Sequence, residues 1–152
     1  MSKAEESAEI RVRVGLFICQ NEKILLARHV KDSREYFMLP GGGVRHGETM
    51  VAALKREMKE EGGVSVEGLR LQALCESIEP EGGRHIVHVV FRGERIEGEP
   101  RSTGLDHRVA EVLWSPLGTF FNLPFYPDIK DYLLEAAERP VGPLYRELRW
   151  LK

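Results

Sequence analysis

Three glutamates, Glu57, Glu60 and Glu61, lie close together near the end of one predicted helix. Their spacing of i, i+3 and i+4 brings three carboxylates to one side of a helix within about one turn. Like charges at this spacing repel, and the negative end of the helix dipole adds to the repulsion, each effect costing tenths of a kcal/mol to about 1 kcal/mol. A divalent cation would reverse the sign of these interactions, and all-oxygen ligands suit Mg²⁺ or Mn²⁺. Taken alone, the glutamates could equally form a charged helix face exposed to solvent.

The elements that must position these glutamates are a glycine-rich loop, a helix and a second loop. Pro40 followed by the three glycines at 41–43 predicts a backbone that turns sharply and exposes its amides and carbonyls. Thr49 is the expected N-cap of the helix, and Gly62-Gly63 is the expected stop. The helix should bury a stripe of apolar side chains at helical spacing, which are Val51, Leu54 and Met58.

The stretch from Gly42 to Val64 contains this helix and resembles the signature of the Nudix hydrolase family at every fixed position. It reads glycine, five residues, Glu48, seven residues and then Arg-Glu-Met-Lys-Glu-Glu-Gly-Gly-Val over 56–64. Such a match arises by chance on the order of once in a million chains or less, so we interpret it as a family resemblance. The resemblance implies an α/β fold of the Nudix type, which is an α/β/α sandwich with a mixed β-sheet. Beyond the motif, the likeness is one of length and element order.

The resemblance also implies roles for residues of the motif. Glu60 and Glu61 match the firmer metal ligands. Glu57 matches a ligand that sometimes acts as the catalytic base, and the carbonyl of Gly41 commonly joins this set. The implied cofactor is Mg²⁺ or Mn²⁺, and the implied catalytic residues are Glu57, Arg56 and Glu61.

The remaining motif positions have supporting roles. Arg56 is expected to orient the carboxylates through charge-assisted hydrogen bonds. Gly42, Glu48 and Gly63 are expected to be structural.

Residues outside the motif offer candidates for substrate binding. Family members often place the general base, or a further ligand, on a later loop, and Asp106 and Glu111 are candidates here, although exposed loop acids explain them as well. Arg28 could reach a phosphate, and Phe37 or Tyr36 could stack on a base. A surface arginine and core packing are the competing interpretations. The candidate substrate-binding residues are therefore Arg28, Phe37 and Glu111.

The histidines do not indicate a zinc site. His85 and His88 are three residues apart on a predicted strand, so their side chains point to opposite faces. The other three histidines, His29, His46 and His107, have no ligand spacing with them.

Alternating apolar residues predict five strands around the motif helix, over 10–18, 23–28, 69–78, 85–96 and 109–114. In the first strand, the alternation puts Arg11 and Arg13 at exposed positions. The segment 29–35 is polar and is expected to be a loop.

Late in the chain, the pattern predicts two further helices. Asp128 is the expected cap of one, and Leu144, Leu148 and Leu151 predict a second, short terminal helix. Strands on both sides of the motif helix, followed by a late amphipathic helix, indicate a layered α/β domain.

Composition indicates a globular chain. Of its 152 residues, 42% are apolar and 30% charged, and the formal charge of 22 minus 24, or −2, argues against a broad nucleic-acid surface. We expect one domain over 1–152, with a flexible tail at 1–8 and a C-terminal extension at 140–152. The expected oligomeric state is a monomer or a homodimer.

The N-terminal residues and the cysteines bear on location. No apolar run reaches the roughly 18 residues that cross a bilayer, and the first ten residues have no signal-peptide core. Cys19 and Cys75 are isolated, and free buried thiols are expected rather than a disulfide. We therefore expect a cytoplasmic protein without a membrane partner.

The family resemblance implies hydrolysis of a pyrophosphate linkage in a nucleoside diphosphate derivative, releasing a nucleoside monophosphate. Pro80, sixteen residues after Val64, favours an ADP-ribose or nucleotide-sugar substrate, although it also lies in a turn. A nucleoside-triphosphate or oxidised-nucleotide pyrophosphohydrolase is the alternative within the enzyme class. A nucleotide-sensing domain without turnover is the alternative outside it, and the retained carboxylates argue against it.

Overall fold

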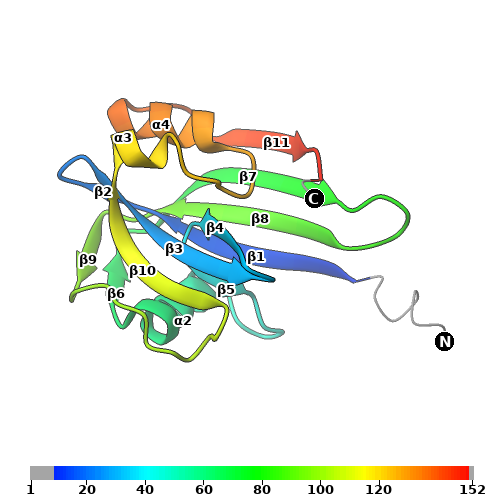
Figure 1. Ribbon diagram of the computed structural model, residues 1–152, viewed down its shortest axis with the longest axis horizontal. Coiled ribbons are helices and arrows are strands. Elements are labelled where there is room, and N and C mark those ends of the chain that lie inside the picture. Colours follow the sequence, from blue (N-terminus) through cyan, green and yellow to red (C-terminus); the bar gives the residue numbers. More distant parts are fainter. Residues whose placement is uncertain (1–8, 151–152) are drawn as a thin grey trace.

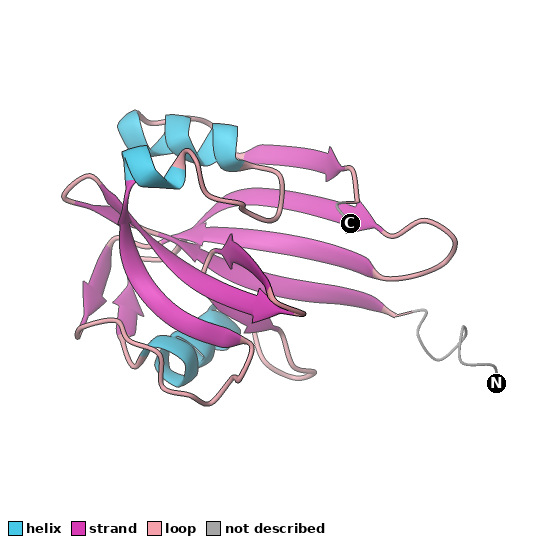
Figure 2. Ribbon diagram, viewed as in Figure 1, coloured by secondary structure: helices cyan, strands magenta, loops and turns pink. Residues whose placement is uncertain are grey.

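The computed structural model describes residues 9–150, in which two larger β-sheets lie between helices and a small third sheet is present. The helix of the motif, α2 (Met50–Gly62), lies on one side of the sheets, and α3 (Leu117–Phe120) and α4 (Lys130–Glu138) lie on the other (Figures 1 and 2). The predicted α/β sandwich is confirmed. Within the described residues, no helix is long and apolar enough to cross a membrane.

The larger sheet has five strands of mixed direction. Its order is β11 (Leu144–Leu148), β7 (Arg70–Ile78), β8 (His85–Arg92), β1 (Ile10–Phe17) and β5 (Gly41–Gly43). β1 runs parallel to β8 and antiparallel to β5, so the glycine strand β5 forms one edge of the sheet and is held there by β1.

The second sheet has the order β10 (Val109–Pro116), β3 (Lys23–Lys31) and β2 (Cys19–Gln20), and β4 (Arg34–Met38) also pairs with β3. A small third sheet pairs β6 (Ser65–Glu67) with β9 (Arg95–Glu97). The strands predicted over 10–18, 23–28, 69–78 and 109–114 are present, whereas the one predicted over 85–96 is wrong as a single strand, because it divides into β8 and β9 in different sheets.

Two apolar cores lie on opposite sides of β1, because successive side chains of a strand point to opposite faces. Val14 and Leu16 enter the core that contains α2, whereas Phe17 enters the core that contains α4. The α2 core thereby fixes the motif helix against the sheet that carries the glycine loop.

The predicted helix ends are confirmed. Thr49 Oγ1 accepts a hydrogen bond from Ala52 N, and Gly63 ends the helix in the left-handed conformation at φ 67°. The predicted buried stripe is wrong at Val51, which is 37% exposed because the first turn of the helix extends beyond the core. Ala53 is buried in its place, and the buried stripe ends at Glu61.

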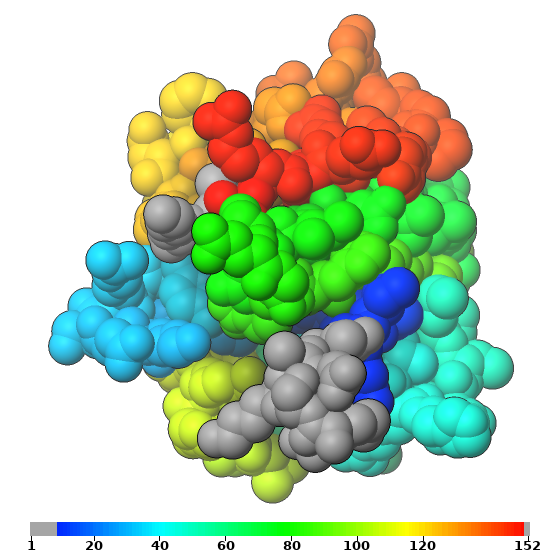
Figure 3. Space-filling view, turned by 90° about the vertical axis from the view of Figure 1, so that its right-hand side faces the viewer, coloured from blue at the N-terminus to red at the C-terminus, as the bar shows by residue number. Residues whose placement is uncertain are grey.

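The loop expected at 29–35 is wrong. β3 continues to Lys31, a two-residue turn follows, and β4 begins at Arg34. Asp32 and Ser33 both have positive φ, at 51° and 62°. Two-residue hairpin turns need this geometry and usually contain Asn-Gly or Asp-Gly. The turn here is Asp32-Ser33, so the sequence gives no such indication. Figure 3 shows this hairpin (light blue) projecting beside β7 and β8 (green).

The predicted terminal helix is also wrong. Residues Leu144–Leu148 form β11, parallel to β7, and burial alternates along it with the period of two that is typical of a strand. Leu151 lies outside the described residues. Asp128 is not the cap of α4, since Ile129 occupies that position without a side-chain hydrogen bond.

Candidate active site

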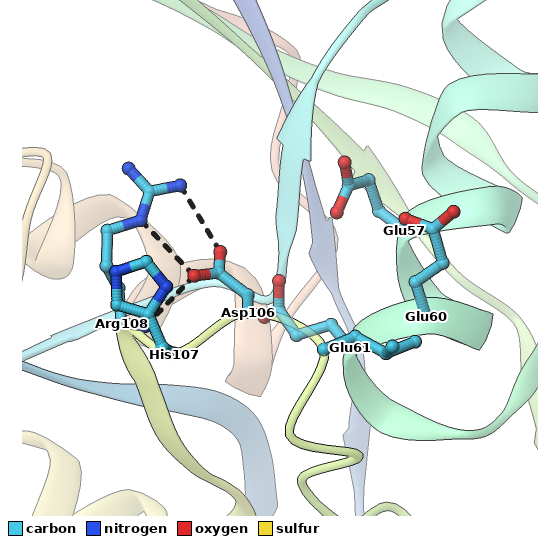
Figure 4. Close-up of a pocket in the computed structure, with 7 residues that line it drawn as sticks. Glu57, Glu60, Glu61, Asp106, His107 and Arg108 are labelled. Atoms are coloured by element: carbon cyan, nitrogen blue, oxygen red, sulfur yellow. Dashed lines mark hydrogen bonds and ion pairs between the residues drawn. The ribbon is translucent and has the colours of Figure 1, made fainter.

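A pocket of about 460 Å³ opens beside the C-terminal half of α2. Its lining consists of Glu57, Glu60 and Glu61 from the helix and of residues 105–108 from the loop before β10. Figure 4 shows the three glutamates on one side of the pocket and Asp106 and Arg108 on the other, with the Glu61 carboxylate pointing across toward Asp106. The sequence motif and a distant loop therefore share one acidic cavity.

Glu61 is the most deeply buried acid of the pocket. Its side chain belongs to the inward stripe of α2, only 4% of the residue is exposed, and Oε1 has no hydrogen-bond partner among the described residues. Burial raises the pKa of Glu61 to about 8, against the opposing charge of Arg13 and in the same direction as Glu57. A backbone hydrogen bond from Gly41 to the carboxyl also opposes the rise in its pKa. The unpartnered oxygen, Oε1, still needs a hydrogen bond, a proton or a cation.

Arg56 connects the helix to the residues that precede it. Nη1 donates to Glu57 Oε1 at 2.8 Å and to Glu60 Oε2 at 3.2 Å. Nη2 donates to Glu48 Oε1 at 2.7 Å and to the Gly43 carbonyl at 3.0 Å. The predicted orienting role of Arg56 thus has a geometric basis, because one guanidinium contacts two of the three motif carboxylates and the loop.

Glu48 faces away from the pocket and ties the loop to the helix. It accepts hydrogen bonds from Arg56 and from the Arg45 backbone N–H, at 2.8 Å for the latter, and these bonds lower the pKa of Glu48 to about 2. Its carboxylate is fully used by these partners, which fits the structural role expected for it.

Two glycines of the motif allow close approaches. A Cβ on Gly41 would lie 1.9 Å from the Val14 carbonyl oxygen, because β5 pairs with β1 at this point. A Cβ on Gly42 would lie 2.4 Å from Glu57 Cδ. The absence of side chains therefore brings the loop backbone against both β1 and a motif carboxylate.

The donor chemistry fits a hard divalent cation, although the carboxylates are not gathered around one point. Among residues 9–150, no group of three or more His, Cys, Asp or Glu side chains is arranged to hold a metal. Arg56 engages Glu57 and Glu60, while Glu61 points away from them toward Asp106. The all-oxygen donor set and the orphaned Glu61 Oε1 are what Mg²⁺ or Mn²⁺ would use.

Of the two late acids, the structure brings only Asp106 to the pocket. Arg108 donates to it from the backbone at 2.9 Å and from Nε at 3.2 Å. Burial tends to raise the pKa of Asp106, but the Arg108 hydrogen bonds outweigh it and leave the pKa lowered. Glu111 instead lies on β10 and pairs with Arg28, at 3.4 Å.

The candidate substrate residues Arg28 and Phe37 are not brought to this pocket either. Arg28 pairs with Glu35 at 3.3 Å, on the face of β3 opposite to that of His29. Phe37 is 5% exposed and packs in the α4 core, in line with the core-packing interpretation. Tyr36 stacks on the His29 ring at a centroid distance of 5.1 Å.

Sequence reasoning missed Arg13, which it placed at an exposed position. The side chain is half-buried, and Nη2 donates to the Leu39 carbonyl at 3.0 Å. The only sequence signal was a charged residue in an otherwise apolar alternation, and that signal does not distinguish the solvent face from the space between two sheets.

The histidines lie in separate environments in the structure. His88 is buried without a partner for either ring nitrogen, while Nε2 of His85 lies 2.9 Å from Glu76 Oε2. Burial, followed by the charge of Arg13, lowers the pKa of His88 to about 3 and that of His29 to about 4. Both rings are therefore neutral at pH 7 and add no positive charge to the interior.

Comparison with known proteins gives three matches that bear on this site. A family model described as the NUDIX domain matches residues 9–136. The ADP-ribose pyrophosphatase of Methanocaldococcus jannaschii is 32% identical over 121 residues, covering 78% of this chain and 70% of that protein. The 8-oxo-dGTP diphosphatase of Escherichia coli is 33% identical over 94 residues, covering 60% and 71%.

Solved structures agree with the family match. The MutT NUDIX hydrolase from Burkholderia pseudomallei superposes with a TM-score of 0.68 at 30% identity, covering 84% of this chain and 97% of that one. The MutT protein from Bacillus halodurans reaches a TM-score of 0.75 at 20% identity, which is a likeness of fold. The acidic pocket on α2 thus lies in a fold shared with these proteins.

Proposed function

Because the chain belongs to the NUDIX family of hydrolases, we propose that it cleaves the pyrophosphate linkage of a nucleoside diphosphate derivative and releases a nucleoside monophosphate. The observation that carries this proposal is the acidic pocket lined by Glu57, Glu60 and Glu61, in which Glu61 Oε1 is buried without a hydrogen-bond partner among the described residues. Three clustered acids are unfavourable without a cation and become useful with one.

The proposed cofactor is Mg²⁺, or Mn²⁺ in its place. Glu57, Glu60, Glu61 and the Gly41 carbonyl would hold it, with Glu57 and Glu60 moving from Arg56 to do so. When bound, the cation would neutralise charge on the phosphate oxygens and acidify a water molecule.

The chain's own residues would then divide the remaining tasks. A water molecule attacks one phosphorus, the bond to the bridging oxygen breaks, and the second phosphate leaves with the electron pair. We assign the acceptance of the water proton to Glu57, with Asp106 as the alternative across the pocket. Arg56, held by its bonds to Glu48 and the Gly43 carbonyl, would stay beside Glu57 and Glu60 after they move and balance part of their negative charge.

The proposed substrate class is ADP-ribose or a nucleotide sugar. The relative from Methanocaldococcus jannaschii, named an ADP-ribose pyrophosphatase, supports this choice, as does Pro80 in the turn after β7. The second candidate is an oxidised or ordinary nucleoside triphosphate, favoured by the relative named 8-oxo-dGTP diphosphatase.

Mass-spectrometric product analysis on a substrate panel tests the proposal. The panel contains ADP-ribose, sugar nucleotides, dNTPs, oxidised dNTPs, dinucleoside polyphosphates and capped RNA, each with Mg²⁺ and with EDTA. We expect Mg²⁺-dependent release of AMP from ADP-ribose at the highest kcat/KM. Ligand-induced stabilisation without any product would instead indicate a nucleotide sensor and contradict the proposal.

A cytoplasmic location and a monomeric or homodimeric state complete the proposal. The two cysteines, half-buried Cys19 and buried Cys75, are both free thiols in the structure, which suits a reducing compartment.

A further inference from the structure

Arg13 extends from β1 toward the base of the glycine loop. In the β1–β5 register, Arg13 is opposite Gly43 and Gly15 is opposite Gly41. The guanidinium folds back along the strand, so that Nη1 lies 3.4 Å from where a Cβ on Gly15 would be, and Nη2 reaches the Leu39 carbonyl. The charged end of Arg13 is therefore beside the loop that opens the motif.

The guanidinium has no anionic partner within the part of the chain that the structure describes. Among residues 9–150, no carboxylate oxygen lies within the 4.0 Å ion-pair distance of its nitrogens, and one hydrogen bond to a side-chain or backbone acceptor, that to Leu39, is present. A guanidinium has five N–H donors. Burying a guanidinium whose N–H donors are mostly without hydrogen bonds costs folding free energy, unless an anion binds to it.

The charge of Arg13 acts on both sheets. It lowers the pKa of His88, its cross-strand neighbour on β8, and of His29, on β3 of the other sheet. Among charged groups, Arg13 also has the largest effect on the pKa of Glu61, which it lowers. The guanidinium, bonded to the Leu39 carbonyl just before the glycine loop, is therefore close enough to Glu61 for their charges to interact.

We propose that Arg13 binds a non-bridging phosphate oxygen of the substrate's pyrophosphate, opposite the carboxylates that would hold the cation. This inference rests on the proposed function. A pyrophosphate carries more than one negative charge, so a cation on the Glu61 side and a guanidinium on the β1 side can clamp it between them. The substrate would supply the anion that residues 9–150 do not.

A purely structural role for Arg13 predicts something different. If its only task were to hold the Leu39 carbonyl, its loss would displace the glycine loop and the Gly41 carbonyl. Metal affinity would then fall together with phosphate affinity. If Arg13 is a substrate ligand, its removal takes a positive charge away from Glu61 and Glu57, so metal affinity stays the same or rises.

The experiment compares wild type, Arg13→Met, Arg13→Lys and Arg70→Met. Arg70 lies at the opposite end of the same sheet, next to Arg92, and is a matched control for loss of one positive charge. Calorimetry measures binding of α,β-methylene-ADP with Mg²⁺, and separately binding of Mn²⁺ alone. Kinetics on the substrate that wild type turns over give KM and kcat.

We expect Arg13→Met to weaken α,β-methylene-ADP binding by about 10-fold or more and to raise KM, with Mn²⁺ affinity unchanged or tighter. Arg13→Lys, which keeps the charge without the planar fork, should recover part of the loss, and Arg70→Met should match wild type. Methylene-ADP binding by Arg13→Met equal to wild type, or a parallel loss of Mn²⁺ affinity, overturns the inference. If Arg13→Met does not fold, an Arg13→Lys variant with wild-type binding and KM overturns it as well. Absence of turnover in wild type contradicts the proposed function instead.

Discussion

The two walls of the acidic pocket are built differently. The α2 wall comes from one continuous stretch, in which Arg56 contacts Glu48, Glu57, Glu60 and the Gly43 carbonyl over short sequence distances. The opposite wall comes from a distant part of the chain, the loop before β10 with Asp106, and the proposed phosphate ligand Arg13 lies on β1, outside the residues that line the pocket. The proposed metal ligands are therefore encoded locally, whereas the surroundings proposed to bind the substrate depend on long-range packing.

This difference has a physical origin. Positions in a helix and its caps follow from spacing alone, since residues three and four apart share a face. Which strands pair, and which face of a strand meets another sheet, depends on contacts between residues far apart in sequence. Mutations in the α2 wall should therefore affect catalysis directly, and those in the opposite wall should affect it through the substrate.

The largest expected effect is that of Glu61→Gln in the α2 wall. We predict a loss of kcat/KM of about 10²–10⁴-fold with the fold intact. Folding of metal-free wild type raises the Glu61 pKa from 4.5 to about 8, so the native state binds more protons than the unfolded state and stability falls as pH rises between these values. The glutamine variant lacks this fall and should be more stable than wild type at pH 8 in EDTA, by up to a few kcal/mol.

Urea unfolding at pH 5 and pH 8 measures this effect, with assays of turnover at saturating Mg²⁺ alongside. Equal pH dependence of stability in wild type and variant would show that Glu61 is not held in a desolvated site.

The glycine loop offers a graded series within the same wall. Gly41→Ala should destabilise the fold by about 2–3 kcal/mol, because its Cβ would collide with the Val14 backbone oxygen. Gly42→Ala meets only the flexible end of Glu57, so it should cost less stability but lower Mn²⁺ affinity. Gly43→Ala has nothing within 4 Å and is the matched control.

Thermal unfolding and Mn²⁺ titration of the three variants measure this series. A Gly41→Ala protein as stable as Gly43→Ala would contradict the close β1–β5 approach.

A smaller effect is expected in the opposite wall. Asp106→Asn removes the acid that lines the pocket and should lower kcat/KM by about 10-fold, since it is either the alternative base or a nearby charge. Glu111→Gln, at the acid that pairs with Arg28 outside the pocket, should lower it less. Steady-state kinetics of both variants decide which late acid serves the site, and a greater loss in Glu111→Gln would reverse the assignment.

The smallest effect is expected at the β3–β4 turn, far from the chemistry. Ser33→Gly should stabilise the fold by about 0.5–1 kcal/mol, because glycine adopts the observed φ of 62° without strain. Urea unfolding measures the gain in stability. Gly82, which has a positive φ in another turn, is already a glycine, so the same gain is not available there. Destabilisation would indicate that the Ser33 side chain contributes a contact that outweighs backbone strain.

The fold class and the motif were predictable because both depend on local rules. Thr49 caps the start of the helix and Gly63 its end, as expected. The acids Glu57, Glu60 and Glu61 line one pocket. Burial of Glu61 itself was not predicted, since a carboxylate on an apolar stripe contradicts simple amphipathic patterning.

The errors occur where tertiary contacts override local pattern. Leucines spaced as in a helix at 144 and 148 form a strand, because β7 offers an edge with which to pair. Arg13 was placed on the solvent side because nothing local reveals the second sheet. Asp32 and Ser33 turn a hairpin without the usual glycine, so the end of β3 and the start of β4 were predicted as a loop.

The account rests on a divalent cation among the α2 carboxylates, and calorimetric titration of the metal-free chain with Mn²⁺ tests it most directly. We predict saturable binding by wild type that is lost or strongly weakened in Glu61→Gln, with release of about one proton when binding is measured near pH 7, since Glu61 is then largely protonated. Absence of binding by wild type, or equal binding by Glu61→Gln, would contradict it.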